Sequence, residues 1–168
     1  MKTFFKVIDK TNEVIGKAIS FLILVFVGVI VYEIVARYIF NTPTIWAHEV
    51  TQMVFGAYVV LLGGFLQQRK GHVNVEILTE HFSPRTKAII NCFTWLFFFA
   101  CCGVMLWKGW DMAWDSFVWR ETESTVFAPP IYPIKMMIPL GALLLLLQGL
   151  VQYIGDLKLA ITGKEETP

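Results

Sequence analysis

Four long apolar segments constrain the fold of this sequence more than any other feature. They cover residues 18–40, 45–67, 88–110 and 134–154, and a helix that crosses the hydrocarbon core of a bilayer needs about 20 residues. Of the 168 residues, 56% are hydrophobic, which is more apolar surface than a soluble domain of this size can bury. The sequence therefore predicts an all-α integral membrane protein, with four transmembrane helices in a single membrane domain over residues 1–168.

The distribution of basic residues predicts how these helices are oriented. Ten Lys and Arg residues lie before the first segment, between the second and third, or after the fourth. They are Lys2, Lys6, Lys10, Lys17, Arg69, Lys70, Arg85, Lys87, Lys158 and Lys164. The other side has four, namely Arg37, Lys108, Arg120 and Lys135. Because cytoplasmic loops carry the excess of positive charge, we expect both termini in the cytoplasm. The net charge of +1 gives no reason to expect nucleic acid as a partner.

Residues 1–17 have a pattern of their own. Phe4, Phe5, Ile8 and Ile15 lie near helical spacing, and most charged residues lie elsewhere around that helix. This favours a short amphipathic helix in the membrane interface, and a disordered basic tail is the alternative. Residues 72–82 could form a second interfacial segment.

The helices are expected to pair as two antiparallel hairpins, the first with the second and the third with the fourth. Gly63 and Gly64 would allow close packing between helices. Trp107, Trp110 and Trp114 are three and four residues apart, which indicates that the third helix continues past residue 110 into the aqueous phase. Residues 129–133 contain three prolines and predict an extended turn before the fourth helix.

Charged residues at the first hairpin are the strongest site candidates, because charges near hydrocarbon are costly. Glu33 and Arg37 are four residues apart in the first helix, and Glu49 follows Trp46 at the start of the second. Arg37 can pair with Glu33 or, across the hairpin, with Glu49. One hypothesis is a small proton-coupled antiporter that uses Glu33, but a neighbouring arginine stabilises the charged carboxylate and opposes that role. We favour a structural role for these charges.

Catalytic and cofactor sites are not indicated. The three histidines are His48, His72 and His81, and only His48 is near a membrane segment, which argues against a haem or quinone anchor. No metal-ligand spacing appears, and no nucleophile motif or phosphate-binding glycine loop is present. The cysteines Cys92, Cys101 and Cys102 all lie in the third segment, where they are expected to act as small hydrophobic side chains. We predict that the chain is not an enzyme and carries no cofactor.

Several short motifs occur in a shared order along the chain. They are Arg37-Tyr38-x-Phe40-Asn41, Trp46-x-x-Glu49, Gly63-Gly64, His72-Val73-Asn74-Val75-Glu76 and the proline-rich entry to the fourth segment. In this order they resemble the small membrane subunit of tripartite ATP-independent periplasmic (TRAP) transporters, the DctQ-like family. The resemblance covers residues 6–155, and Glu76 stands where an aspartate is more usual.

The resemblance implies a function and a set of partners. Transporters of this family import organic acids across the bacterial inner membrane with a sodium gradient, and a periplasmic substrate-binding protein delivers the substrate. The small subunit is a multi-pass scaffold that packs, together with membrane lipids, against the large polytopic subunit. Residues of the first hairpin, Glu33, Arg37, Trp46 and Glu49, are then candidates for structural or interface roles. The charged residues near the third connection, Asp111, Asp115, Arg120, Glu121 and Glu123, are candidates for docking the binding protein.

Overall fold

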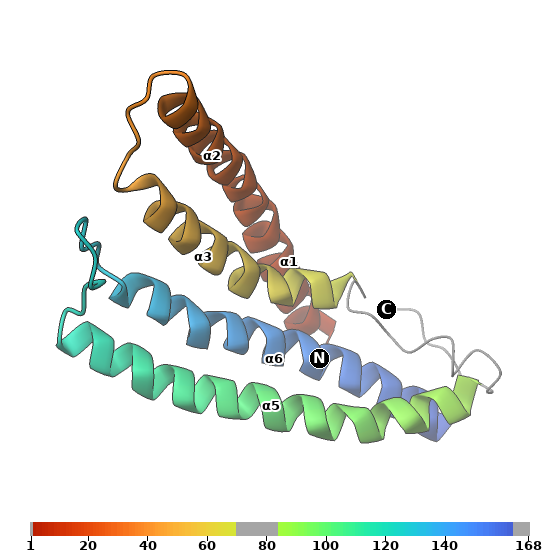
Figure 1. Cartoon of the computed structure of the whole chain (residues 1–168). Coiled ribbons are helices and arrows are strands. Elements are labelled where there is room, and N and C mark those ends of the chain that lie inside the picture. Colours follow the sequence, from red (N-terminus) through yellow and green to blue (C-terminus); the bar gives the residue numbers. More distant parts are fainter. Residues whose placement is uncertain (1, 70–83, 163–168) are drawn as a thin grey trace.

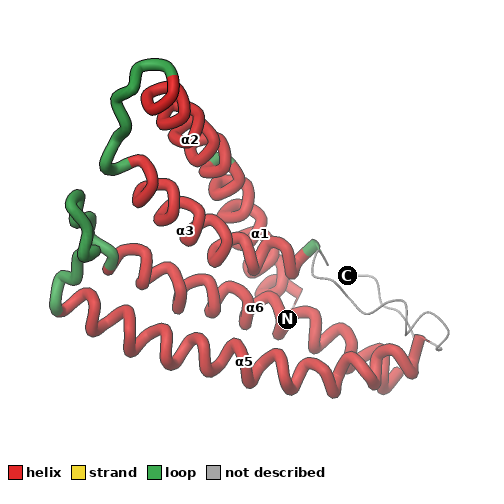
Figure 2. Tube along the Cα trace, in the orientation of Figure 1, coloured by secondary structure: helices red, strands yellow, loops and turns green. Residues whose placement is uncertain are grey.

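Five α-helices make up most of the computed structural model, which describes residues 2–69 and 84–162. They are α1 (Lys2–Ser20), α2 (Leu22–Tyr38), α3 (Ala47–Gln68), α5 (Pro84–Val118) and α6 (Tyr132–Thr162), shown in Figure 1. Figure 2 shows that the described loops join these helices at their ends. The β-structure within the described ranges is one isolated bridge between Thr122 and Pro130. The predicted all-α fold is confirmed.

Four helical segments are long and apolar enough to cross a membrane. They are Phe5–Tyr38, Ala47–Gln68, Ile89–Val118 and Tyr132–Leu159, which confirms the predicted number. The first contains both α1 and α2, because the helix is interrupted only at Phe21. The 35 residues of α5 reach Val118, so the third helix does continue past residue 110. At 1.5 Å per residue α5 is about 50 Å long, well beyond a hydrocarbon core of about 30 Å.

The two expected hairpins are present, and α6 joins them. Helix α2 packs against α3, and α5 packs along α6, while α6 also contacts α3 and α1. In Figure 1 the α2–α3 hairpin diverges from α5 and α6 toward the 39–46 connection and converges with them at the opposite end. We call the part that carries the 39–46 and 119–131 connections the loop end, and the part where α1 joins the bundle the α1 end.

Glycines allow the close approach of α3 and α6. Gly63 and Gly64 are buried, and a Cβ added at Gly64 would lie 3.1 Å from the Leu144 Cβ. A Cβ at Gly141 would lie 2.5 Å from the Val60 carbonyl oxygen, which is backbone and cannot move aside as a side chain can. The prediction that Gly63 and Gly64 serve helix packing is thus confirmed, and Gly141 adds a second point of contact.

Helix α1 packs with one face against the bundle. Ile8, Asn12, Gly16 and Ile19 are buried, and their spacing of four, four and three residues places them on one side of the helix. Gly16 lies against the Phe65 ring of α3. Residues 2–20 are therefore helical, as the sequence pattern indicated, and their position in the membrane interface stays a prediction. The possible interfacial segment at 72–82 lies outside the described residues.

Candidate functional site

The connection between α2 and α3 is organised around the carboxylate of Glu33. Its Oε1 accepts hydrogen bonds from Arg37 Nε at 2.9 Å and from Arg37 Nη2 at 2.5 Å. Its Oε2 accepts one from the Thr44 backbone N–H at 3.2 Å and another from the Thr44 hydroxyl. Glu33 thus ties the last turns of α2 to the loop that leads into α3.

The engagement of both oxygens bears on the antiporter hypothesis. A proton-carrying carboxylate must exchange its partners during transport, whereas Glu33 is held by four donors from two residues. Charge-assisted hydrogen bonds of this kind stabilise the ionised carboxylate. The geometry therefore favours a structural role for Glu33.

Of the two pairings open to Arg37, the structure contains the one with Glu33. Glu49 lies in the first turn of α3, where the positive end of the helix dipole favours a carboxylate. Its Oε2 is buried and has no hydrogen-bond partner among the described residues. A buried polar atom without a partner is uncommon in folded proteins and calls for an explanation.

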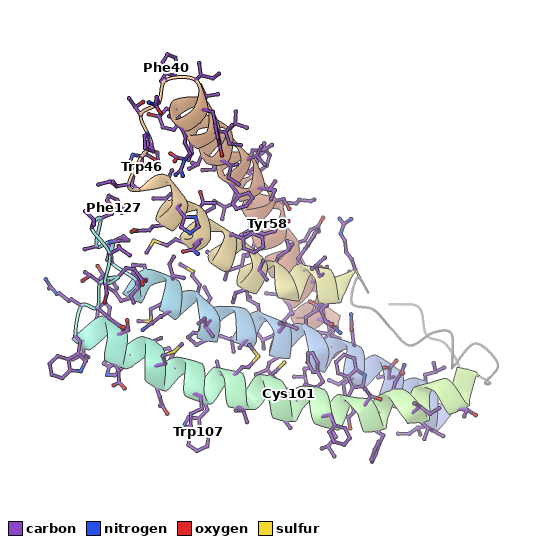
Figure 3. All side chains as sticks on the ribbon, in the orientation of Figure 1. Phe40, Trp46, Tyr58, Cys101, Trp107 and Phe127 are labelled. Carbon is purple, nitrogen blue, oxygen red and sulfur yellow. The ribbon has the colours of Figure 1, made fainter. Side chains whose placement is uncertain are left out.

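Trp46 contacts α2 and so helps to position the start of α3. It is the residue just before α3, and its ring stacks on Tyr32 of α2, with 5.9 Å between ring centroids and 26° between ring planes. Asn41 has a positive φ of 53°, which fits a turn because Asn tolerates this conformation better than most residues. Figure 3 shows Trp46 at the start of α3 and Phe40 near the tip of the connection.

The second connection at the loop end, residues 119–131, is a compact turn. The Glu123 N–H donates to the Pro129 carbonyl at 2.9 Å, and the Ile131 N–H donates to the Glu121 carbonyl at 3.0 Å. Arg120 and Ala128 take positive φ values of 45° and 46°. The expected extended turn before α6 is thus present and held by backbone hydrogen bonds.

The five predicted docking residues differ in whether their charges are already paired within the chain. Glu121 accepts a hydrogen bond from Lys135 Nζ at 2.5 Å, and the Lys135 ammonium holds the pKa of Glu121 below its usual range. Asp111 is 3.4 Å from Lys108 Nζ. The side chains of Asp115, Arg120 and Glu123 are exposed. The charges most available to a partner are therefore these last three.

Aromatic rings follow the same part of α5. Trp110 stacks on Trp114 with 6.3 Å between ring centroids, Trp114 lies beside Phe117, and Phe117 contacts Tyr132 of α6. Trp110, Asp111, Trp114 and Asp115 line a shallow surface hollow. Tryptophans near the end of a membrane-spanning helix are typical of the boundary between hydrocarbon and headgroups.

A set of side-chain amides at the α1 end was not identified from the sequence. Gln148 of α6 is 2% exposed, accepts a hydrogen bond from Asn12 Nδ2 at 2.8 Å and donates one to Asp9 Oδ1 at 2.9 Å. One turn further, Gln152 donates to the Gln67 carbonyl and accepts from its side chain. A further turn along, Asp156 accepts from the Trp95 indole N–H at 2.8 Å.

These contacts join α6 to each of three other helices. Gln148 bonds to α1, Gln152 to α3 and Asp156 to α5. The sequence signal was the four-residue spacing of positions 148, 152 and 156, which places three polar side chains on one face of an otherwise apolar helix.

Among the residues that the structure describes, no group of three or more His, Cys, Asp or Glu side chains is placed to hold a metal ion. His48 is exposed on α3. His72, His81 and the 72–76 motif lie outside the described residues.

Comparison with known proteins identifies the family. The sequence model for the DctQ component of tripartite ATP-independent periplasmic transporters matches residues 26–159. The chain belongs to this family. It is a multi-pass membrane component of a TRAP transporter.

A curated relative agrees with this assignment. Over 97 residues the chain is 31% identical to the sialic acid TRAP transporter permease protein SiaT of Haemophilus influenzae. The match covers 57% of this chain and 15% of the relative, so the relative is a much longer protein and the likeness concerns one part of it.

Proposed function

We propose that this chain is the non-catalytic scaffold subunit of a sodium-gradient-driven TRAP transporter that imports small organic acids across the bacterial inner membrane. Its partners are a large polytopic membrane subunit and a periplasmic substrate-binding protein, and both of its termini lie in the cytoplasm. The relative is named for sialic acid, which is an organic acid, and the distribution of Lys and Arg supports the orientation.

The observation that carries the scaffold role is the use of the polar side chains within the membrane segments. Glu33 bonds to Arg37 and to Thr44 of the loop, and Gln148 and Gln152 bond to neighbouring helices. Side chains that hold helices together are not available to bind and release a substrate. This favours a rigid body that supports transport by another subunit.

We place the contact with the large subunit at the first hairpin, with Glu49, Arg37, Trp46 and Glu33 as its organising residues. The carboxylate of Glu49 supports this placement. The residue is half-buried and its Oε2 lacks a hydrogen-bond partner among the described residues, so we propose that the carboxylate turns outward to bond to a basic side chain of the large subunit. The outward side of α2 is apolar and exposed, and offers surface for helix packing. It includes Val27, Val31, Ile34 and Tyr38.

The binding protein would meet the loop end. Asp111, Asp115, Arg120, Glu121 and Glu123 lie on or beside the 119–131 connection. Charges at the rim of such a contact act mainly on the rate of encounter.

The test is co-purification of this chain with the large subunit, together with uptake measurements in cells that express both. Glu49→Ala should reduce the yield of the complex more than Arg37→Ala does, because Arg37 is already paired within the chain. Gln52→Ala is the matched control, since Gln52 is exposed one turn further along α3. Wild-type complex yield and uptake in both the Glu49 and Arg37 variants would exclude the assignment.

Transport by the isolated chain in liposomes would point to the antiporter hypothesis instead. That activity should then be abolished by Glu33→Gln.

A further inference from the structure

We infer that α1 carries a binding site for an anionic phospholipid. The site is a hollow on its surface lined by Val7, Lys10, Thr11, Val14 and Ile15. Successive residues turn by about 100° around a helix, so these side chains follow one another around α1 in the order Lys10, Val14, Val7, Thr11, Ile15. Lys10 therefore stands at one edge, and the apolar side chains continue from it.

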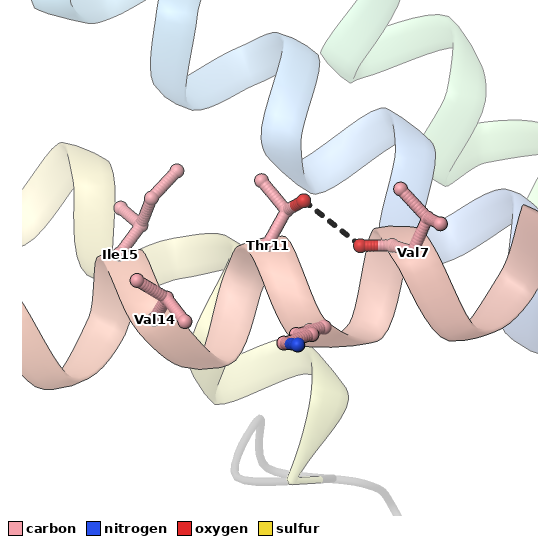
Figure 4. Close-up of a pocket in the computed structure, with 5 residues that line it drawn as sticks. Val7, Thr11, Val14 and Ile15 are labelled. Carbon is pink, nitrogen blue, oxygen red and sulfur yellow. Dashed lines mark hydrogen bonds between the residues drawn. The ribbon is translucent and has the colours of Figure 1, made fainter.

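The side chains that line the hollow are mostly apolar and exposed. Val7 and Val14 are 57% and 58% exposed. The Thr11 hydroxyl donates to the Val7 carbonyl at 2.8 Å, so its hydrogen is used within the helix. Figure 4 shows this bond and the side chains of Val7, Thr11, Val14 and Ile15 along the same stretch of α1. An acyl chain would find methyl groups along most of this surface.

The positive charge of Lys10, at the edge of the hollow, favours an anionic headgroup. Lys10 is exposed and makes no ion pair among the described residues. Lys17, on the same side of the helix, is already engaged with Glu13 at 2.6 Å. An ammonium group beside a strip of methyl groups matches the phosphate and the first part of an acyl chain of one phospholipid molecule.

A lipid is a better occupant than a further helix of this chain. The opposite side of α1 already packs on α3 and α6 through Ile8, Asn12 and Gly16, and α1 continues into a membrane-spanning segment. The exposed side of α1 therefore faces the surroundings of the bundle. With α1 in the membrane interface, as its sequence predicts, lipid is the abundant apolar component there.

The experiment is native mass spectrometry of the full chain in a mild detergent. Phosphatidylglycerol is titrated against phosphatidylcholine with identical acyl chains, and glycerol phosphate serves as the headgroup without chains. We expect phosphatidylglycerol to bind about fivefold more tightly than phosphatidylcholine, the effect of one basic residue near a lipid headgroup. Lys10→Gln should remove this preference, and Lys10→Arg should keep it. Lys17→Gln is the matched control and should leave most of it.

Equal binding of the two lipids by the wild-type chain would overturn the proposal, as would equal losses in the Lys10→Gln and Lys17→Gln variants. Binding of glycerol phosphate as tight as that of the lipid would show a simple anion site and would also overturn it. A second measurement locates the lipid directly. Phosphatidylglycerol with a photoreactive acyl chain should label the peptide that contains residues 7–15, and labelling confined to other peptides would exclude the site.

Discussion

The two ends of the bundle are held together by different chemistry. At the loop end two ion pairs, Arg37 with Glu33 and Lys135 with Glu121, accompany the stack of Trp46 on Tyr32. Each ion pair has at least one partner with considerable exposure. At the α1 end the contacts run between helices through Gln148 and Gln152, and Gln148 is almost fully buried.

The ion pairs at the loop end order a local stretch of chain, whereas the hydrogen bonds at the α1 end fix how the helices pack together. The Arg37–Glu33 pair links residues four positions apart and shapes one turn of chain, and salt weakens exposed ion pairs. The Gln148–Asn12 bond joins residues 136 positions apart and fixes where α1 lies on α6. We therefore expect the α1 end to determine the helix arrangement and the loop end to determine the shape that a partner meets.

The largest effect should come from the crossing of α3 and α6, on which both ends depend. Gly141→Ala places a methyl group 2.5 Å from the Val60 carbonyl oxygen. Overpacking typically costs about 1–3 kcal/mol and occasionally more, and we expect a cost at the upper end because the opposing atom is backbone. Thermal unfolding in detergent, followed by circular dichroism, should show a lower midpoint. Gly28→Ala is the control, because a Cβ there meets no atom within 4 Å. Equal midpoints for the two variants would contradict the close packing described here.

A smaller effect is expected from Gln148→Leu, which tests the α1 end alone. The change leaves Asn12 without its acceptor and Asp9 without a donor, and an unpaired buried polar group costs about 1–3 kcal/mol. Helix α1 should then separate from the bundle more often. A cysteine at the buried position Ile8, in a chain with Cys92, Cys101 and Cys102 replaced, should react faster with a maleimide. Gln52→Leu should leave that rate unchanged, and an unchanged rate in Gln148→Leu would show that the amides do not hold α1.

The smallest expected effect is a dependence of stability on pH, which comes from the Lys135–Glu121 ion pair at the loop end. Because the Lys135 ammonium lowers the pKa of Glu121, the folded chain binds this proton less readily than the unfolded chain. The stabilisation is complete above the unfolded pKa of about 4.3 and is lost as the pH falls through the lower folded value. Unfolding midpoints measured from pH 6 to pH 3 should fall slightly more for the wild type than for Glu121→Gln. Glu123→Gln, at an exposed position, should follow the wild type. A wild-type curve parallel to that of Glu121→Gln would show no linkage.

Much of the fold could be predicted because the bilayer imposes simple rules on sequence. Length and hydropathy predicted the number of membrane segments. The tryptophan spacing predicted that the third helix continues past residue 110, and α5 ends at Val118. The sequence predicted a division at residues 17–18, between an amphipathic helix and the first membrane segment, but not its position at Phe21. No glycine or proline occurs at Phe21, and the helical segment Phe5–Tyr38 is otherwise continuous.

The sequence predicted which residues belong to the candidate site but not which of them pair with each other. The sequence placed Glu33, Arg37 and Glu49 near one another, yet two partners for Arg37 were sterically open. The loop decided between them, because Thr44 donates to Glu33 and holds its carboxylate beside Arg37. The amide contacts of Gln148 were missed since helical spacing identifies a shared face but not the helix that the face meets.

The close contact at Gly141 also determines how this subunit can move. With the Val60 carbonyl against the backbone of α6, a sliding displacement of one hairpin along the other would drive main-chain atoms into each other. The contacts of Gly63 and Gly64 with α6 lie further along the same two helices and oppose a rotation about Gly141. Force applied by a neighbouring subunit to one hairpin would therefore be carried to the other without a shift in register.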